Sequence, residues 1–459
     1  MPQRFQSVNI FKKLPSGQLL LSLRNAGWMF FDKIFRMATS LLVGIWLARY
    51  LGPEQFGVLN YVYVFPLMLS ALVSLGINTL LSSEIPTAAS HAETDRLVLT
   101  SVILKVTAGL LAFGLIMMAN IYFHQRTPQL LALVTISASG LLFQGFDAVD
   151  IYFQSIRKVQ YSIIPKVAAF SLATGARLYG LTQGLGLSFF VSIMVVELAM
   201  GYLTIYLLYL QQRQLPALLF AFDKKTARQL LRAAWPIMMA EFFIFLYMRL
   251  DQVMIKQLAG SVELGKYSAA LRISEAWYFV AAALTASFYP GIIALRPDNY
   301  AAYLQRYQHL LNLLATLGIG IGLAFGILAE PLTQLLYGTQ YVGVGTILSI
   351  HIWTGVFVFL GVGSNNWYVV EHLQKFLLGR TIAGAVLNVL LNVVLIPRYG
   401  AVGASIATLA AQLFAAYLTN GFYARTAEVF KLQTNALLFL PKWLVAGLKR
   451  VVSITNRPL

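Results

Sequence analysis

The stretch RLDQVMIKQLAGSVELGKYSAALRISEAWYFVAAALTASFYPGI, residues 249–292, decides which kind of fold this chain adopts. From Gly265 onward it offers more than 20 residues of mainly apolar helix, which is long enough to cross a hydrocarbon core about 30 Å thick. Arg249 and Asp251 nevertheless lie in the apolar segment that precedes the turn, and charge is costly inside a membrane. The stretch therefore predicts a hairpin of two membrane spans whose charged residues are candidates for a functional role.

The composition of the whole chain agrees with a membrane protein. Of its 459 residues, 58% are hydrophobic and only 11% are charged, whereas soluble proteins carry about 25% charged residues. Similar apolar runs recur along the chain, which predicts a polytopic membrane protein. The first run begins near Asn25 and carries Asp32, Lys33 and Arg36, so it is not expected to be a cleaved signal peptide. The absence of cysteine excludes disulfides, thiolate metal sites and cysteine nucleophiles.

Hydropathy predicts twelve spans, and the basic residues predict their orientation. If the N-terminus is cytoplasmic, the inner segments hold 22 Lys and Arg residues, and the outer loops hold only Arg126 and Arg398. This asymmetry places both termini in the cytoplasm. The net charge of +17 is then an orientation signal and a contact with anionic lipid, not a nucleic-acid surface. The predicted spans are 26–50, 57–81, 97–120, 129–155, 161–182, 185–210, 233–257, 265–293, 307–328, 343–369, 378–396 and 401–424.

The predicted outer loops are short, and the longest, at about 328–342, has roughly fifteen residues by these span limits. No soluble domain is expected on either face, and the chain shows no phosphate-binding glycine loop, zinc-ligand spacing or nucleophile motif. We therefore expect that the protein is not an enzyme and has no bound cofactor or metal.

The two halves of the chain resemble each other. Leu23-Arg24 matches Leu231-Arg232 at an offset of 208, while Lys158 matches Lys375 at an offset of 217. Six spans per half give a parallel repeat, with a substrate site expected between the two lobes. The predicted fold is thus an all-α polytopic membrane protein of about 12 transmembrane helices in two six-helix lobes. The predicted parts are a cytoplasmic amphipathic N-terminus (1–25), an N-lobe (26–210), a cytoplasmic basic linker (211–232), a C-lobe (233–424) and a cytoplasmic interfacial tail (425–459).

The first span carries a polar stripe. Asn25, Asp32, Arg36 and Thr39 follow at helical spacing on one face. Asp32 and Arg36 are four residues apart, so they can pair. Arg36 lies about ten residues, or roughly 15 Å, from the inner face of the membrane, which is too deep for its guanidinium to reach the interface easily.

The seventh and eighth spans bring further charges to one level. Arg249 precedes the turn by about nine residues and Arg272 follows it by about seven, so both are expected roughly 10–14 Å below the outer face. Asp251 and Glu275 occupy neighbouring levels. Arginine binds phosphate bidentately and stays charged at any working pH, so a cavity with several arginines suits an anionic headgroup such as a diphosphate. The alternative interpretation is that these residues form structural ion pairs that lock helices together.

Further polar residues within the spans carry weaker signals. Asn388 and Asn392 are expected to join helices by hydrogen bonds rather than to bind substrate, and His351 is expected to be a satisfied interior residue. Charged residues of the first half for which structural and functional interpretations weigh equally are Lys105, Asp147, Asp150, Arg177 and Glu197.

Several segments resemble one known family. The hairpin 249–292 is similar to a segment that recurs in bacterial polysaccharide exporters of the Wzx flippase type. AVLNVLLNVVLIPRYGAVGASIATL, residues 385–409, resembles the penultimate hairpin of that family, and WLARYLGPEQFGVLNYVYVF, residues 46–65, resembles its first hairpin. The resemblance extends from about Leu23 to Arg425.

This resemblance implies a MATE-like fold of the multidrug/oligosaccharidyl-lipid/polysaccharide (MOP) exporter superfamily, with two lobes around a central cavity. It also implies translocation of undecaprenyl-diphosphate-linked oligosaccharides, with Arg36, Arg249 and Arg272 in the position to hold the diphosphate. Asp32, Asp251 and Glu275 are then candidates for counter-charge or ion coupling, and whether H⁺ or Na⁺ is the coupling ion stays open.

The sequence therefore predicts a flippase of the cytoplasmic membrane for polysaccharide repeat units, of the O-antigen, capsule or exopolysaccharide kind. Its expected partners are a lipid-linked oligosaccharide, membrane lipids, and a polysaccharide polymerase with glycosyltransferases. Two other functions stay open. One is a drug or cation antiporter of the MATE type, although organic cations prefer aromatic and acidic cavities. The other is a non-transporting scaffold of a glycan synthase complex.

Overall fold

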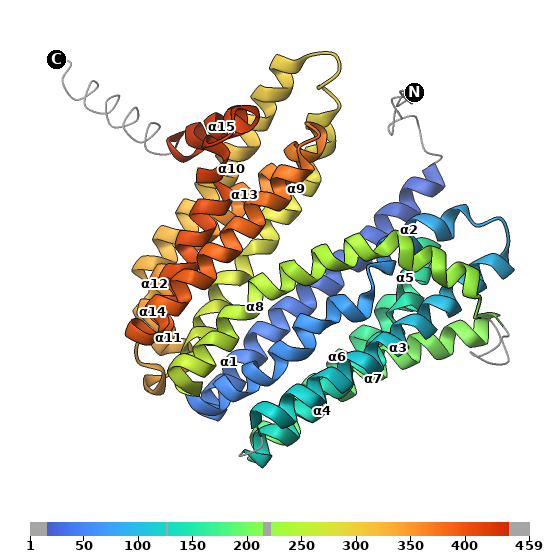
Figure 1. Ribbon diagram of the computed structural model, residues 1–459, viewed down its shortest axis with the longest axis horizontal. Helices are drawn as coiled ribbons and strands as arrows, with labels where there is room; N and C mark the ends of the chain where they lie inside the picture. The colour runs from blue at the N-terminus through green and yellow to red at the C-terminus, as the bar shows by residue number, and fades with distance from the viewer. Residues whose placement is uncertain (1–15, 125–126, 214–221, 440–459) are drawn as a thin grey trace. The chain divides into compact units, whose positions relative to one another are not determined.

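A computed structural model describes residues 16–124, 127–213 and 222–439 of the chain (Figure 1). Within these ranges every regular element is a helix, and no strand is present. The segment 440–459, which holds most of the predicted interfacial tail, and the first fifteen residues lie outside the described part.

The described chain passes through long helices joined by short connections. The first half consists of α1 (Ser16–Ser74), α2 (Ile77–Glu84), η1 (Ile85–Thr87), α3 (His91–His124), α4 (Pro128–Gln144), α5 (Asp147–Ser155), α6 (Gln160–Thr182) and α7 (Leu187–Arg213). The second half consists of α8 (Lys224–Ser274), η3 (Glu275–Trp277), α9 (Tyr278–Ile293), α10 (Tyr300–Ile327), α11 (Ala329–Tyr337), η4 (Thr339–Tyr341), α12 (Val344–His351), α13 (Thr354–Val370), α14 (Gln374–Ala416), η5 (Leu418–Gly421), η6 (Ala424–Thr426) and α15 (Ala427–Leu437).

Eight helical segments of the described chain are long and apolar enough to cross a membrane. Three of them, Phe31–Ser74, Met248–Ile293 and Gln374–Gly421, have 44, 46 and 48 residues, or about twice the length of one span. Each is broken at a glycine, so each forms two spans. Together with α6, whose 23 residues include Lys166 and Arg177, the described helices give the predicted number of about twelve spans.

The breaks in α1 and α8 repeat the same backbone conformation. Gly52 has φ 69° and ψ 170°, and Gly260 has φ 91° and ψ 177°. Residues with a side chain are almost excluded from this region, so glycine permits both turns. The two glycines are 208 residues apart, which is the offset of the sequence repeat at these helices.

These two turns also pack against each other reciprocally. A side chain at Gly57 would collide with the carbonyl oxygen of Ser261, and one at Gly265 would collide with the carbonyl oxygen of Pro53. Both pairs of equivalent positions, 53 with 261 and 57 with 265, are again related by 208 residues. The contact is therefore pseudo-symmetric, as a parallel repeat requires.

A second repeated feature is the turn after α5 and after α13. Arg157 and His372 both have a positive φ, of 61° and 58°. The N–H of Lys158 donates to the carbonyl of Phe153 at 2.9 Å, and the N–H of Leu373 donates to Tyr368 at 2.7 Å. This is the Schellman pattern that ends helices. The two turns correspond at an offset of 215 residues. In the structure Lys158 therefore matches Leu373 rather than Lys375, since the geometry of the cap is repeated while the residue identity is not.

The helix α8 begins nine residues before the predicted start of the seventh span. Asp223 caps it, since the hydroxyl of Thr226 donates to Asp223 Oδ2 at 2.5 Å and its N–H does so at 2.9 Å. These bonds to the ionised carboxylate lower the pKa of Asp223. The last part of the predicted basic linker is therefore helical.

Two compact units are distinguishable by packing. Unit 1 comprises residues up to Val43 and Val62–Leu246, and unit 2 comprises Gly44–Tyr61 with residues from Tyr247 on. The core of unit 1 packs α2, α3 and α5 around Leu81, Val98 and Phe153. The core of unit 2 packs α10 and α13 around Tyr307 and Trp367. These units are defined by which residues pack together, whereas the predicted lobes are sets of consecutive membrane spans. The units therefore do not test the predicted lobe boundaries, which stay a prediction.

Candidate functional site

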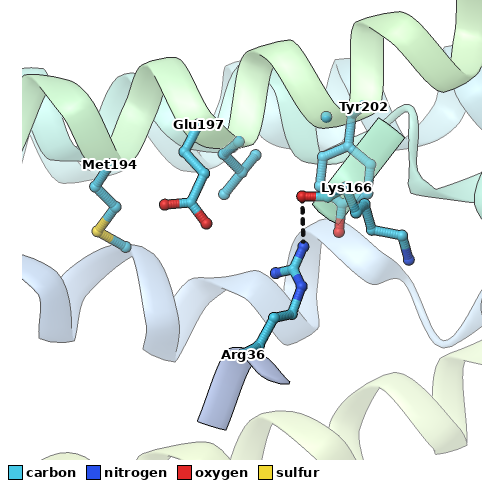
Figure 2. A pocket seen from close by; sticks show the side chains of 7 residues that line it. Arg36, Lys166, Met194, Glu197 and Tyr202 are labelled. Carbon is cyan, nitrogen blue, oxygen red and sulfur yellow. Dashed lines mark hydrogen bonds between the residues drawn. The ribbon is translucent and has the colours of Figure 1, made fainter. Parts of the chain in front are cut away.

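Arg36 has three partners in unit 1. Its Nε donates to Asp32 Oδ1 at 2.8 Å, which confirms the pairing predicted from their spacing of four residues. Its Nη2 donates to the backbone carbonyl of Lys166 on α6 at 3.1 Å (Figure 2), and its guanidinium lies 5.1 Å from the ring centroid of Phe170. The side chain still keeps 30% of its surface exposed. Arg36 is thus oriented by three partners without being enclosed.

Two pockets are lined by this arginine. One has a volume of about 330 Å³ and is lined by Asp32, Gln154 and Ser162 among others. The other has a volume of about 200 Å³, and Figure 2 shows Glu197 and Tyr202 in its wall. Arg36 and Lys166 line both pockets. The larger pocket reaches the lower end of the volumes typical of ligand sites.

Lys166 is a residue of this region that the sequence analysis missed. Its Nζ contacts Asp150 Oδ2 at 2.7 Å, and the hydroxyl of Ser162 donates to the other oxygen of Asp150. One signal was available, because Lys166 is the only lysine in the predicted fifth span. A charge in a span is a functional candidate by default.

A second lysine of unit 1 is in a closed environment. Lys105 is fully buried, and its Nζ contacts Asp147 Oδ1 at 2.6 Å and Asn78 Oδ1 at 2.5 Å. Asn78 in turn donates to Asp147 Oδ2 at 3.0 Å. Neither of the two pockets reaches this cluster. The structural interpretation therefore fits Lys105 and Asp147.

In unit 2, Arg249 and Asp251 have different partners, although they are two residues apart. Arg249 Nη2 contacts Glu275 Oε2 at 3.4 Å, and both side chains are about one-quarter exposed. Asp251 is buried and accepts hydrogen bonds from the hydroxyl of Tyr267 and from the backbone N–H of Gln252. Arg249 thus has its carboxylate partner beyond the turn, whereas Asp251 is held by a hydroxyl and a backbone N–H.

Asp251 stands at one end of a chain of polar side chains. The hydroxyl of Tyr267 lies 3.5 Å from Thr408 Oγ1, to which Asn388 donates at 3.4 Å. Asn392 donates to Asn388 Oδ1 at 2.9 Å. This arrangement agrees with the expected role of the two asparagines in joining helices.

Arg272 is positioned by an aromatic ring and by the backbone. Its guanidinium lies 5.3 Å from the ring centroid of Phe56 and packs so closely on Gly44 that a methyl group there would overlap it. All three residues belong to unit 2. Arg272 is partly exposed, so its position depends on a glycine that leaves room for it.

The six predicted site residues thus fall into two groups. Arg36 and Asp32 lie together in unit 1, whereas the other four lie in unit 2, where Glu275 contacts Arg249. His351 is buried, and its Nδ1 lies 2.7 Å from the hydroxyl of Ser274, as expected for an interior histidine. Among the residues that the structure describes, no group of three or more His, Asp or Glu side chains could hold a metal ion.

Comparison with known proteins identifies the family. The polysaccharide biosynthesis protein family matches residues 22–295, which is more than half of the chain. The chain belongs to this family. A protein of Shigella dysenteriae named "Putative O-antigen transporter" is 22% identical to this family member over 372 residues, which cover 79% of this chain and 89% of that protein.

Solved structures share the fold. A lipid II flippase, MurJ in an inward closed conformation, matches with a TM-score of 0.65 at 14% identity, covering 96% of this chain and 94% of that one. An inward-facing multidrug resistance MATE transporter of the MOP superfamily matches with a TM-score of 0.65 at 15% identity, covering 87% and 96%. These neighbours confirm the predicted MATE-like fold. The named relatives are transporters and flippases rather than enzymes, in agreement with the expectation from the sequence.

Proposed function

We propose that this family member is a flippase that moves undecaprenyl-diphosphate-linked oligosaccharide repeat units across the cytoplasmic membrane for the biosynthesis of O-antigen, capsule or exopolysaccharide. The observation that carries the proposal is that arginines within the spans, Arg36 above all, are held by neighbouring groups yet keep an exposed surface. The relatives named as an O-antigen transporter and a lipid II flippase support the same substrate class.

The diphosphate would bind to Arg36, Arg249 and Arg272. Each is a permanent cation with several N–H donors, and guanidinium groups match the geometry of phosphate oxygens. Arg36 keeps 30% of its side chain exposed and Arg249 keeps 23%. Each of these two side chains therefore keeps surface that a ligand can contact.

The carboxylates would hold these cations while the site is empty. Asp32 contacts Arg36, and Glu275 contacts Arg249 at the longer distance of 3.4 Å. An arginine without any counter-charge in an apolar bundle would be costly. A diphosphate can take over this role, since it carries more charge than a single carboxylate.

The protein would lie in the inner membrane with both termini in the cytoplasm, as the distribution of Lys and Arg predicts. The two lobes would rock between inward-open and outward-open states around the substrate, which is the behaviour of transporters built from repeats. Glycosyltransferases on the cytoplasmic side would supply the lipid-linked unit, and a polymerase on the outer side would use it.

Asp251 is the carboxylate best suited to couple transport to an ion gradient. It is buried and joined through Tyr267 and Thr408 to Asn388 on another helix. A proton or a Na⁺ ion that neutralises Asp251 would change this hydrogen-bonded chain and could bias one conformation. The rate of flipping under an imposed H⁺ or Na⁺ gradient distinguishes the two ions.

The substrate proposal is tested in cells that lack the gene. We expect lipid-diphosphate-linked oligosaccharide to accumulate on the cytoplasmic leaflet, measured in oriented vesicles with an impermeant lectin. Wild-type protein should restore the outer-leaflet pool, whereas Arg272→Gln should lower the rate of restoration about tenfold to a hundredfold, because a charge-assisted hydrogen bond contributes about 1.5–3 kcal/mol.

Arg296→Gln is a matched control. Arg296 also pairs with a carboxylate, Glu371, at 2.8 Å, but it lies in the connection between two spans and not within a span. It should restore flipping as wild type does. A normal leaflet distribution in the deletion strain, with no second exporter, would contradict the proposal and would favour a drug antiporter. Full activity of a stably expressed Arg272→Gln protein would remove Arg272 from the site.

A further inference from the structure

Lys166 lines the same two pockets of unit 1 as Arg36 does. The carbonyl of Lys166 accepts a hydrogen bond from Arg36. Each is paired with one carboxylate, Arg36 with Asp32 and Lys166 with Asp150. Two cations therefore lie where the two pockets share their lining.

The pair of Lys166 differs from the pair of Lys105 in its access to these pockets. Asp147 and Asp150 lie one turn apart on α5, and each binds a lysine of another helix. The side chain of Lys105 has no exposed surface, whereas that of Lys166 keeps 22%. An ammonium group has three donors. Lys166 can therefore be reached by a ligand anion that exchanges with Asp150.

The charges around the pockets favour an anionic ligand. Glu197 lines the smaller pocket, but Arg177 contacts it at 2.6 Å. Asp32 and Asp150 are compensated by Arg36 and Lys166. The lining of the larger pocket also includes Lys33. Counted together, the charged lining residues and their ion-pair partners stay positive when every ion pair is formed. They are the four cations Lys33, Arg36, Lys166 and Arg177 and the three carboxylates Asp32, Asp150 and Glu197.

We propose that Lys166 is a diphosphate-binding residue of this site. The diphosphate of the lipid-linked substrate binds between Lys166 and Arg36, and its oxygens take the positions that Asp150 and Asp32 occupy around the two cations. This inference rests on the proposed function, and it adds a residue and a mode of binding, in which phosphate replaces carboxylate. Lysine binds phosphate as a point charge, and arginine binds it as a fork, so the two side chains complement each other.

The proposal is tested by binding of geranylgeranyl diphosphate to the full-length protein in nanodiscs, with geranylgeraniol as the uncharged counterpart. Wild-type protein should prefer the diphosphate. Lys166→Gln should weaken binding of the diphosphate about tenfold or more and leave binding of the alcohol unchanged, while Lys166→Arg should retain affinity. Inorganic pyrophosphate should compete more weakly than the lipid, because it lacks the apolar chain.

Asp150→Asn provides a test with the opposite sign. Its amide oxygen can still accept from Lys166 and Ser162, but the competing negative charge is gone, so binding of the diphosphate should tighten several-fold. A residue that only maintained the fold would give weaker binding or none. Arg213→Gln is the matched control, because Arg213 is bound to Asp95 in the same unit and lines neither pocket. It should bind as wild type does.

The outcomes separate this inference from the proposed function. If wild type prefers the diphosphate and Arg36→Gln weakens it, but Lys166→Gln does not, then Lys166 only orients Arg36 and the inference is wrong while the function stands. Weaker binding by Asp150→Asn would also overturn it. If pyrophosphate competes as strongly as the lipid, the site binds free phosphates. If wild type shows no preference for the diphosphate, the proposed function itself fails.

Discussion

Two regions of unit 1 hold ion pairs of the same chemistry but differ in their access to pockets. Around Lys105, the charges are enclosed, and Lys105, Asp147 and Asn78 bind one another. Around Arg36 and Lys166, the ion pairs have similar lengths but open on pockets. An enclosed pair contributes to the fold, and removal of one partner leaves an uncompensated charge. An accessible pair can exchange one partner for a ligand, so access rather than distance separates the two roles.

The largest expected effect breaks the enclosed pair. Lys105→Met leaves the carboxylate of Asp147 buried without its cation, which should destabilise the protein by about 3–5 kcal/mol. We expect a much lower midpoint of thermal unfolding in detergent and little protein in the membrane. The double variant Lys105→Met/Asp147→Leu should recover part of this loss, because it removes both charges.

Lys166→Met is the matched substitution in the open region, and it should unfold near the wild-type midpoint because Asp150 still accepts from Ser162. A much lower midpoint of thermal unfolding for Lys166→Met, together with a wild-type midpoint for Lys105→Met, would contradict this assignment of the structural role to Lys105.

An intermediate effect concerns Asp251, an enclosed carboxylate of unit 2. Asp251→Asn keeps the shape and the hydrogen-bonding capacity of the side chain, so the protein should fold. The amide cannot take up a proton or compensate a Na⁺ ion, so we expect flipping to lose its response to an imposed ion gradient. Where that gradient supplies about 1.4 kcal/mol to the wild-type protein, the flipping rate of the variant should be about tenfold lower. A variant that responds to the gradient as wild type does would make Asp251 a structural residue like Asp147.

The smallest expected effect shifts an arginine without removing it. Gly44→Ala would place a methyl group on the guanidinium of Arg272, which would have to leave the ring of Phe56. Because a cation–π contact contributes about 0.5–2 kcal/mol, flipping should fall about threefold to tenfold while the fold is kept.

Gly27→Ala, on the same helix in open space, should have no effect on flipping. The double variant Gly44→Ala/Arg272→Gln should be no worse than Arg272→Gln alone. Additive losses would show that Gly44 acts independently of Arg272.

Local spacing predicted part of the site. The pair of Asp32 and Arg36 followed from residues four apart on one helix, and the structure confirms it. The contact of Glu275 with Arg249 crosses 26 residues and a turn, and the neighbourhood of Phe56, Gly44 and Arg272 joins segments more than 200 residues apart. The hairpin placed Glu275 near the level of Arg249, but sequence spacing does not say which faces of the helices meet, so the choice of partners could not be predicted.

By itself, the sequence determined the membrane environment, about twelve spans and the parallel repeat, because hydropathy, helix length and glycine turns are local properties that lipid constrains strongly. The resemblance to exporters gave the MATE-like fold. Only the tertiary structure decided that Lys105 is enclosed while Lys166 and Arg36 share two pockets, although all three are cations within spans. Access to a cavity depends on how several helices pack together, and this packing is set by side chains distributed over the whole unit.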